Sequence, residues 1–155
     1  MALKENRQTW QTNIDCTVSG VAERGGILSF VPGVAGLCEY ADVTATSGAL
    51  AKPVGLLLDD VEALNYYTHP EYRQRNVVPA GSVVGIATEG EFWTDFVEQT
   101  TDDGVSVGTY APGDTLYLAD DGKVSRQQID NIRPQVGVAL TALTSDGFLK
   151  IRLEI

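Results

Sequence analysis

Two aspartate–glycine clusters carry the oxygen ligands that this sequence could offer to a hard cation. They are Asp102-Asp103-Gly104 and Asp120-Asp121-Gly122. An EF-hand loop that binds Ca²⁺ alternates its ligands and ends on a distal bidentate glutamate, and neither cluster has this arrangement. Aspartate and glycine are also common turn residues, because aspartate bonds nearby backbone and glycine accepts a positive φ. We therefore predict a turn at each cluster and no metal site.

Acid–base chemistry would have to use His69, the single histidine, or the adjacent pair Asp59 and Asp60. A catalytic histidine needs a nucleophile or an orienting carboxylate nearby, and the chain contains no G-x-S-x-G sequence. Neighbouring residues of a strand point to opposite faces, so the two aspartates would not share a site. Residues 33–36 also lack the Lys-Ser/Thr ending of a phosphate-binding loop. We expect no enzyme activity, no catalytic residue and no cofactor.

Cys16 and Cys38 are the only cysteines in the chain. They form no C-x-x-C pair, and no histidine pair matches them as zinc ligands would require. We favour two reduced thiols that pack as small apolar side chains. A disulfide stays open as an alternative, and so does a metal-binding or nucleophilic role.

An irregular stretch at 59–76 combines aromatic and basic side chains. Tyrosine and arginine are enriched where protein interfaces bind most strongly. Single-stranded nucleic acid also stacks on aromatic rings beside arginines. We predict a loop that contacts a protein partner, with a solvated loop or another ligand as alternatives. Its predicted interface residues are Tyr66, Tyr67, His69, Tyr72, Arg73 and Arg75.

The chain is strongly acidic, with 21 Asp and Glu against 11 Lys and Arg and a formal net charge of −10. Such a charge repels phosphate backbones and anionic membrane surfaces. We expect neither a nucleic-acid nor a membrane partner, and instead charge complementarity to a basic patch on a protein. The polar start at 1–7 lacks the apolar segment of a signal peptide, so we expect the chain to be made in a cytoplasm.

Valine, threonine and aromatic residues between Gly, Asp and Pro turns predict an all-β fold. We expect a small β-sandwich or β-barrel, jelly-roll or β-tulip-like, with an extended N-terminal arm. The 155 residues divide into an arm and first strand at 1–18 and a single β domain at 19–155. Residues 10–18 alternate and form either a strand within the chain or an arm on a neighbouring subunit. Trp10 and Ile14 on its apolar face are further predicted interface residues.

The remaining strand predictions come from apolar runs and turn residues. The continuous run at 54–58 suits a strand buried on both faces. Residues 83–88 and 91–99 suggest a hairpin joined by a tight turn at Glu89-Gly90. Residues 105–110 suggest another strand. The last one, from Leu149, alternates most clearly, with apolar residues up to Ile155 on one face.

Four stretches carry a resemblance to a known family. They read Pro53-Val-Gly-Leu-Leu-Leu-Asp-Asp-Val, Val78-Pro-Ala-Gly-Ser-Val-Val-Gly, Pro112-Gly-Asp-Thr-Leu-Tyr-Leu-Ala-Asp-Asp-Gly-Lys-Val and Pro134-Gln-Val-Gly-Val-Ala-Leu. In these strand and turn signatures the chain resembles the head decoration (cement) proteins of tailed bacteriophages. The resemblance covers residues 50–155 and leaves out the N-terminal third.

The resemblance implies a non-enzymatic virion protein on the capsid surface, assembled in the host cytoplasm. Such a protein binds the outside of the icosahedral shell and stabilises contacts between major capsid protein subunits. It implies a homo-oligomer, with a trimer favoured over a dimer, and we expect residues 2–18 and 64–75 to make the shell contacts. One alternative is a low-copy tail, vertex or fibre-associated β module. Another is a small β-barrel ligand-binding domain or enzyme.

Overall fold

A computed structural model describes residues 8–43, 52–60, 77–78, 80–101, 104, 106–128 and 132–155. These ranges form the predicted all-β fold, a closed barrel with further strands attached, and contain no α-helix. The strands are β1 (Gln8–Val18), β2 (Ala22–Glu23), β3 (Ile27–Phe30), β4 (Leu37–Tyr40), β5 (Pro53–Asp60), β6 (Val77–Val78), β7 (Val83–Thr94), β8 (Thr115–Leu118), β9 (Val124–Ser125), β10 (Gln135–Ala139) and β11 (Leu149–Glu154). In the described ranges no helix is long and apolar enough to cross a membrane.

Five strands close the barrel, in the order β1-β4-β3-β5-β7, with β7 pairing back to β1. The β1–β4 pair is parallel and the others are antiparallel. The alternating stretch at 10–18 is therefore a strand of this chain, and its backbone pairs along β7 from Gln8 to Thr17. Residues 1–7 of the predicted arm lie outside the described ranges.

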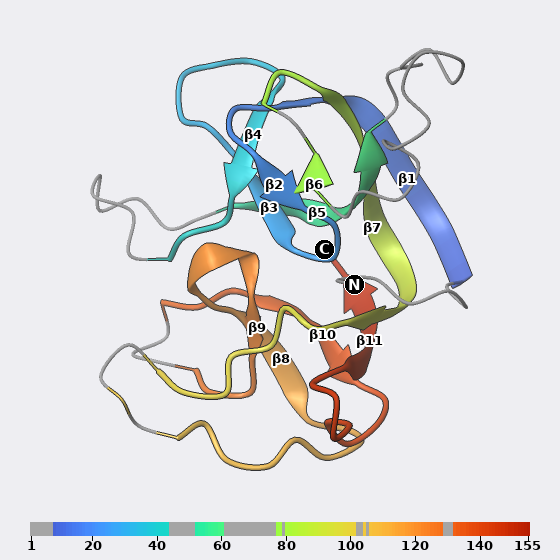
Figure 1. Cartoon of the computed structure of the whole chain (residues 1–155), viewed down its shortest axis with the longest axis vertical. Helices are drawn as coiled ribbons and strands as arrows, with labels where there is room; N and C mark the ends of the chain where they lie inside the picture. The colour runs from blue at the N-terminus through green and yellow to red at the C-terminus, as the bar shows by residue number, and fades with distance from the viewer. Residues whose placement is uncertain are drawn as a thin grey trace.

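The nine-stranded sheet that forms the barrel continues from β7 through β11, β10, β8 and β9, and we call this continuation the second sheet; β2 and β6 form a separate two-stranded pair. Figure 1 shows the barrel strands in the upper half of the view and β8 to β11 in the lower half. The two parts share β7, whose first residues pair with β5 and whose last residues pair with β11. One strand thus belongs to both parts and joins them.

The fold has two apolar cores, one on each face of the wall that β3, β5 and β7 form. The core inside the barrel includes Leu28, Leu57 and Ile86. The other core lies between the barrel and the second sheet and includes the neighbours of these residues, Ile27 and Leu56 among them. Successive residues of β3 and β5 therefore enter different cores, as strand geometry requires. This confirms the prediction that the apolar run at 54–58 is buried on both faces.

The predicted hairpin at Glu89-Gly90 is wrong, because β7 runs through these residues without turning. Gly90 pairs with Thr9 of β1 on one edge and with Leu153 of β11 on the other. Backbone pairing on both edges outweighs the weak turn preference of a Glu-Gly pair. The stretch 83–88 and the first part of 91–99 are the two ends of this one strand, which stops at Thr94, so 95–99 are not part of it.

Two other strand predictions need correction, one for a whole stretch and one for its last residue. Residues 106–110 form no strand; Ser106 makes an isolated bridge to Thr100, and the buried residues Val107 and Tyr110 are three apart rather than alternating. In β11, Leu149, Ile151 and Leu153 are buried as predicted, but Ile155 follows the strand and is 39% exposed. The turn at Asp120–Gly122 is confirmed and forms the short 3₁₀ segment η2 between β8 and β9.

Gly137 of β10 lies directly against the backbone of β11, opposite Leu153. A Cβ atom at this position would lie 2.1 Å from the carbonyl oxygen of Arg152, and a backbone atom cannot rotate away as a side chain can. Glycine is therefore required by space at this point of the second sheet.

We expect Gly137→Ala to lower the free energy of unfolding by about 2–3 kcal/mol, the usual cost of overpacking a filled interior. Gly20→Ala is the matched control, since no atom lies within 4 Å of the Cβ it would add. Urea denaturation followed by intrinsic fluorescence measures both. Equal stabilities of the two variants would contradict the close approach of β10 to β11.

Candidate functional site

The side chains of the predicted interface residues lie outside the described positions, so these residues stay a prediction. Trp10 and Ile14 belong to β1, but their side chains lie outside the described positions. The loop residues of 64–75 fall wholly outside them. Two other polar groupings are described in full, one buried and one open to solvent.

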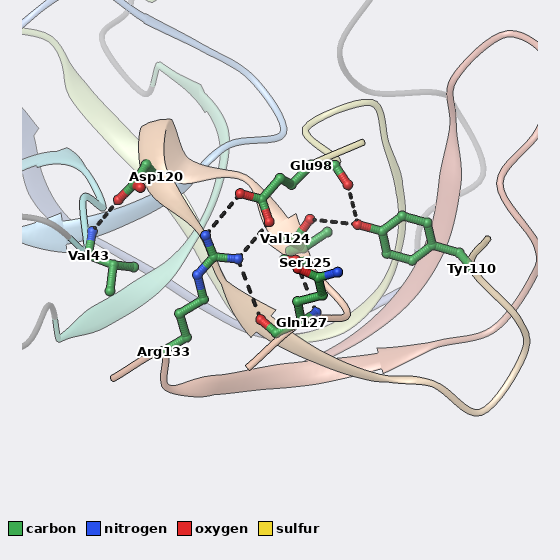
Figure 2. A network of polar contacts seen from close by, with 8 residues as sticks. All are labelled: Val43, Glu98, Tyr110, Asp120, Val124, Ser125, Gln127 and Arg133. Carbon is green, nitrogen blue, oxygen red and sulfur yellow. Dashed lines mark hydrogen bonds and ion pairs between the residues drawn. The ribbon is translucent and has the colours of Figure 1, made fainter. Parts of the chain in front are cut away.

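The buried grouping is built on an ion pair between Glu98 and Arg133, whose side chains are only 7% and 5% exposed. Two guanidinium nitrogens of Arg133 donate to the two carboxylate oxygens, at 2.6 and 2.9 Å. Figure 2 shows the two groups facing each other, with Arg133 also reaching the backbone oxygen of Gln127. This two-pronged geometry is the strongest form of carboxylate recognition by arginine.

Tyr110 extends the buried grouping toward β9. Its hydroxyl donates to the backbone oxygen of Glu98 and lies 3.4 Å from that of Val124 (Figure 2). Burial raises the pKa of Tyr110 to about 12, so its hydroxyl keeps its proton. The contact ties the segment after β7 to β9, which gains few backbone bonds of its own.

The charge on Glu98 is maintained by its partners. Burial raises its pKa, but hydrogen bonds from Arg133 and Ser125 lower it by more, and the net pKa is below the ordinary value of 4.5. Each carboxylate oxygen thus has a donor. Because both charges are buried and satisfied by one another, this grouping holds loops in place rather than facing a substrate.

The open grouping is a groove of about 550 Å³ that runs from one end of the barrel along β4 to η2. Its apolar lining comes from Val21 and Pro32 in the loops after β1 and β3, and from Tyr40. The described charged residues that line it are all acids, namely Glu39, Asp42 and Asp121. All three acids are exposed.

Tyr40 at the end of β4 is held on several sides. Its hydroxyl donates to the backbone oxygen of Glu23 at 3.1 Å and accepts from the backbone N–H of the same residue. Its ring packs against Phe96, with centroids 5.6 Å apart. A Cβ atom on Gly26 would lie 2.6 Å from the ring, so the tyrosine fits closely against this backbone. The tyrosine side of the groove is therefore rigid.

The segment η2 brings Asp121 to the groove from the second sheet. The backbone N–H of Gly122 donates to Ala41, and the Asp120 carboxylate accepts from the backbone N–H of Val43 at 2.9 Å. Gly122 has a φ of +69°, and a Cβ there would lie 2.7 Å from the backbone oxygen of Ile27. Only glycine satisfies both conditions, so η2 can dock against β3 and β4.

Exposed apolar side chains occur in two of the segments that supply the groove's lining, at Val21 and on either side of Pro32. Val21 is 66% exposed, and Phe30 and Val34 are each 48% exposed. They belong to the loop after β1 and to the end of β3 with the loop that follows it. Exposed large apolar residues that border a concave surface are typical of protein docking sites.

The two cysteines lie in contact in the barrel core. Both side chains are buried, and neither is bonded in a disulfide. Burial, and next a hydrogen bond with Cys16, raises the pKa of Cys38 to about 12. In the parallel pairing of β1 with β4, Cys38 stands opposite Val18 rather than Cys16. This diagonal register favours packed thiols over a disulfide bridge.

In the described ranges, no group of three or more His, Cys, Asp and Glu residues could hold a metal ion. Asp59 and Asp60 form the end of β5, with their side chains outside the described positions. His69, Asp102 and Asp103 also lie outside them.

Sequence reasoning missed the groove, although parts of it carried a signal. The alternation in Leu37–Tyr40 indicates that Glu39 points away from Cys38, and the Asp120–Gly122 turn was predicted. No local pattern indicates that this turn meets β4, because a long stretch of chain separates the two. No family model matches the chain, and no curated protein is significantly similar to it.

We expect Glu98→Gln to lower the free energy of unfolding at neutral pH by about 3 kcal/mol, because Arg133 keeps a buried charge without its counterion. A carboxylate with a lowered pKa stabilises the fold above its ordinary pKa, and this stabilisation is lost as the pH falls through the folded-state pKa. Wild-type stability should therefore fall as the pH drops below 4.5, and the variant should lack part of that fall. Urea denaturation across this pH range measures both effects.

Glu91→Gln is the control, since it removes a carboxylate that pairs with Lys150 and Arg152 near the surface. Surface pairs are screened and contribute little to stability. A Glu91 variant as destabilised as the Glu98 variant would contradict the special role of the buried pair.

We expect both thiols to resist alkylation in the folded protein, because they are buried and Cys38 stays protonated at neutral pH. Iodoacetamide at pH 8 should label neither cysteine in native buffer and both in urea, as measured by intact mass. Rapid labelling of the native protein, or absence of labelling in urea without reductant, would contradict the packed-thiol arrangement.

Proposed function

We propose that this protein is a non-enzymatic structural component of a tailed-phage virion. It binds the outside of the icosahedral capsid and stabilises contacts between major capsid protein subunits. The sequence resemblance to decoration proteins supports the phage context. The groove with its apolar border supports the binding role, and this observation carries the proposal.

The resembling stretches and the groove occupy different parts of the fold. The stretches from Pro53, Pro112 and Pro134 enter β5, β8 and β10, so the resemblance lies mainly in the framework. Most of the groove comes from residues 18–42, which the resemblance does not cover. We expect the framework strands to resemble those of other decoration proteins, and the binding face to differ because it must fit the surface of one particular shell.

The pairing of β1 changes which residues we expect to touch the shell. Residues 8–18 belong to the barrel, so they are not a free arm that could add a strand to a neighbour. The proposed contacts therefore become residues 2–7, the 64–75 loop and the groove. Many copies, each binding weakly, would hold to one shell through avidity. We retain a homotrimer as the first proposal for the assembly and a dimer as the second.

Copy number in purified virions tests this function. Quantitative mass spectrometry against the major capsid protein should give a simple ratio between the two proteins. A small fixed number per particle would move the protein to the tail or a vertex. Complete absence from virions would overturn the structural role and favour a ligand-binding β-barrel.

A further inference from the structure

We propose that the acidic groove binds an extended polypeptide segment whose Lys or Arg side chain lies beside a small apolar residue. The groove is defined by residues 18–22, Pro32, Glu39, Tyr40, Asp42 and Asp121. The inference rests on the proposed function, since it gives the chemistry of the partner that the docking surface recognises.

The charges of the groove select a cation. Glu39 from β4 and Asp121 from η2 reach it from the barrel and from the strands beyond it, and none of the described residues that line it is basic. Lys123 pairs with Asp121 at 3.4 Å while both side chains stay largely exposed. An exposed pair of this kind is weak and gives way readily to an incoming cation.

The apolar lining favours a particular kind of residue next to the cation of the bound segment. Val21 and Pro32 face the groove together with the half-buried Tyr40. The aliphatic stem of a lysine or arginine packs on such side chains while its charged end reaches a carboxylate. A small apolar residue next to the cation would cover Val21, which is 66% exposed.

Exposed apolar residues flank Pro32 in the sequence outside the groove's lining, which favours a chain over a small molecule as the occupant. Phe30 and Val34 add exposed apolar area in the segment that contains Pro32. A second copy of this protein is disfavoured as the occupant, because it carries the same −10 charge. Nucleic acids and anionic membranes are repelled for the same reason.

The test uses a library of random heptapeptides selected on the immobilised full chain. We expect enriched peptides to contain Lys or Arg next to Val, Ala, Ile or Leu. Enrichment without cationic residues, or no enrichment at all, would overturn the proposal.

The double variant Glu39→Gln, Asp121→Asn tests the site itself. Isothermal titration with one enriched peptide at low salt should show binding weakened about fivefold, the expected loss for two exposed ion pairs. High salt should remove the difference between variant and wild type. Unchanged binding by a folded double variant would overturn the assignment.

The control is the double variant Glu89→Gln, Glu154→Gln, which removes the same two charges at a separate hollow near the end of β11. It should bind the peptide within about twofold of wild type, because net charge alone has a small effect. Equal weakening in both double variants would overturn a specific groove. The selection is independent of virion copy number, so either proposal can fail while the other stands.

Discussion

The structure depends on the double use of β7. Its backbone closes the barrel against β1 and β5, and its far end pairs with β11 to start the second sheet. Because β7 has strand partners on both edges, its backbone N–H and C=O groups are already hydrogen-bonded and cannot form a turn. Its two faces both carry apolar residues. The two cores therefore form on either side of one wall, and neither part can be removed without opening the other.

The junction between the two parts depends on small residues and shared polar contacts. Gly122 lets η2 lie against Ile27 and Tyr40, and the Asp120 carboxylate bonds the backbone beyond β4. Beside β9, the Glu98–Arg133 pair holds segments that have few strand bonds. Buried charges of this kind specify one arrangement of loops, because any other leaves a charge without its partner.

The groove is a consequence of this junction. Glu39 is exposed because it alternates with the buried Cys38, and Asp121 reaches the same place because η2 docks on β4. A rigid wall, an apolar border and acids from two sheets make a surface suited to a cationic protein segment. For a capsid-binding protein, such a surface would add selectivity to the weak contacts of each copy.

The sequence by itself determined the all-β class, most strand positions, the double burial of 54–58 and the turn at Asp120–Gly122. These follow from alternation and turn chemistry, which act between near neighbours. Tertiary structure decided that Glu89-Gly90 continues a strand, that Glu98 pairs with Arg133 and that Asp121 lines the same groove as Glu39. Each depends on backbone or charged groups brought together from distant segments, and their energies outweigh local preference only once the sheets have formed.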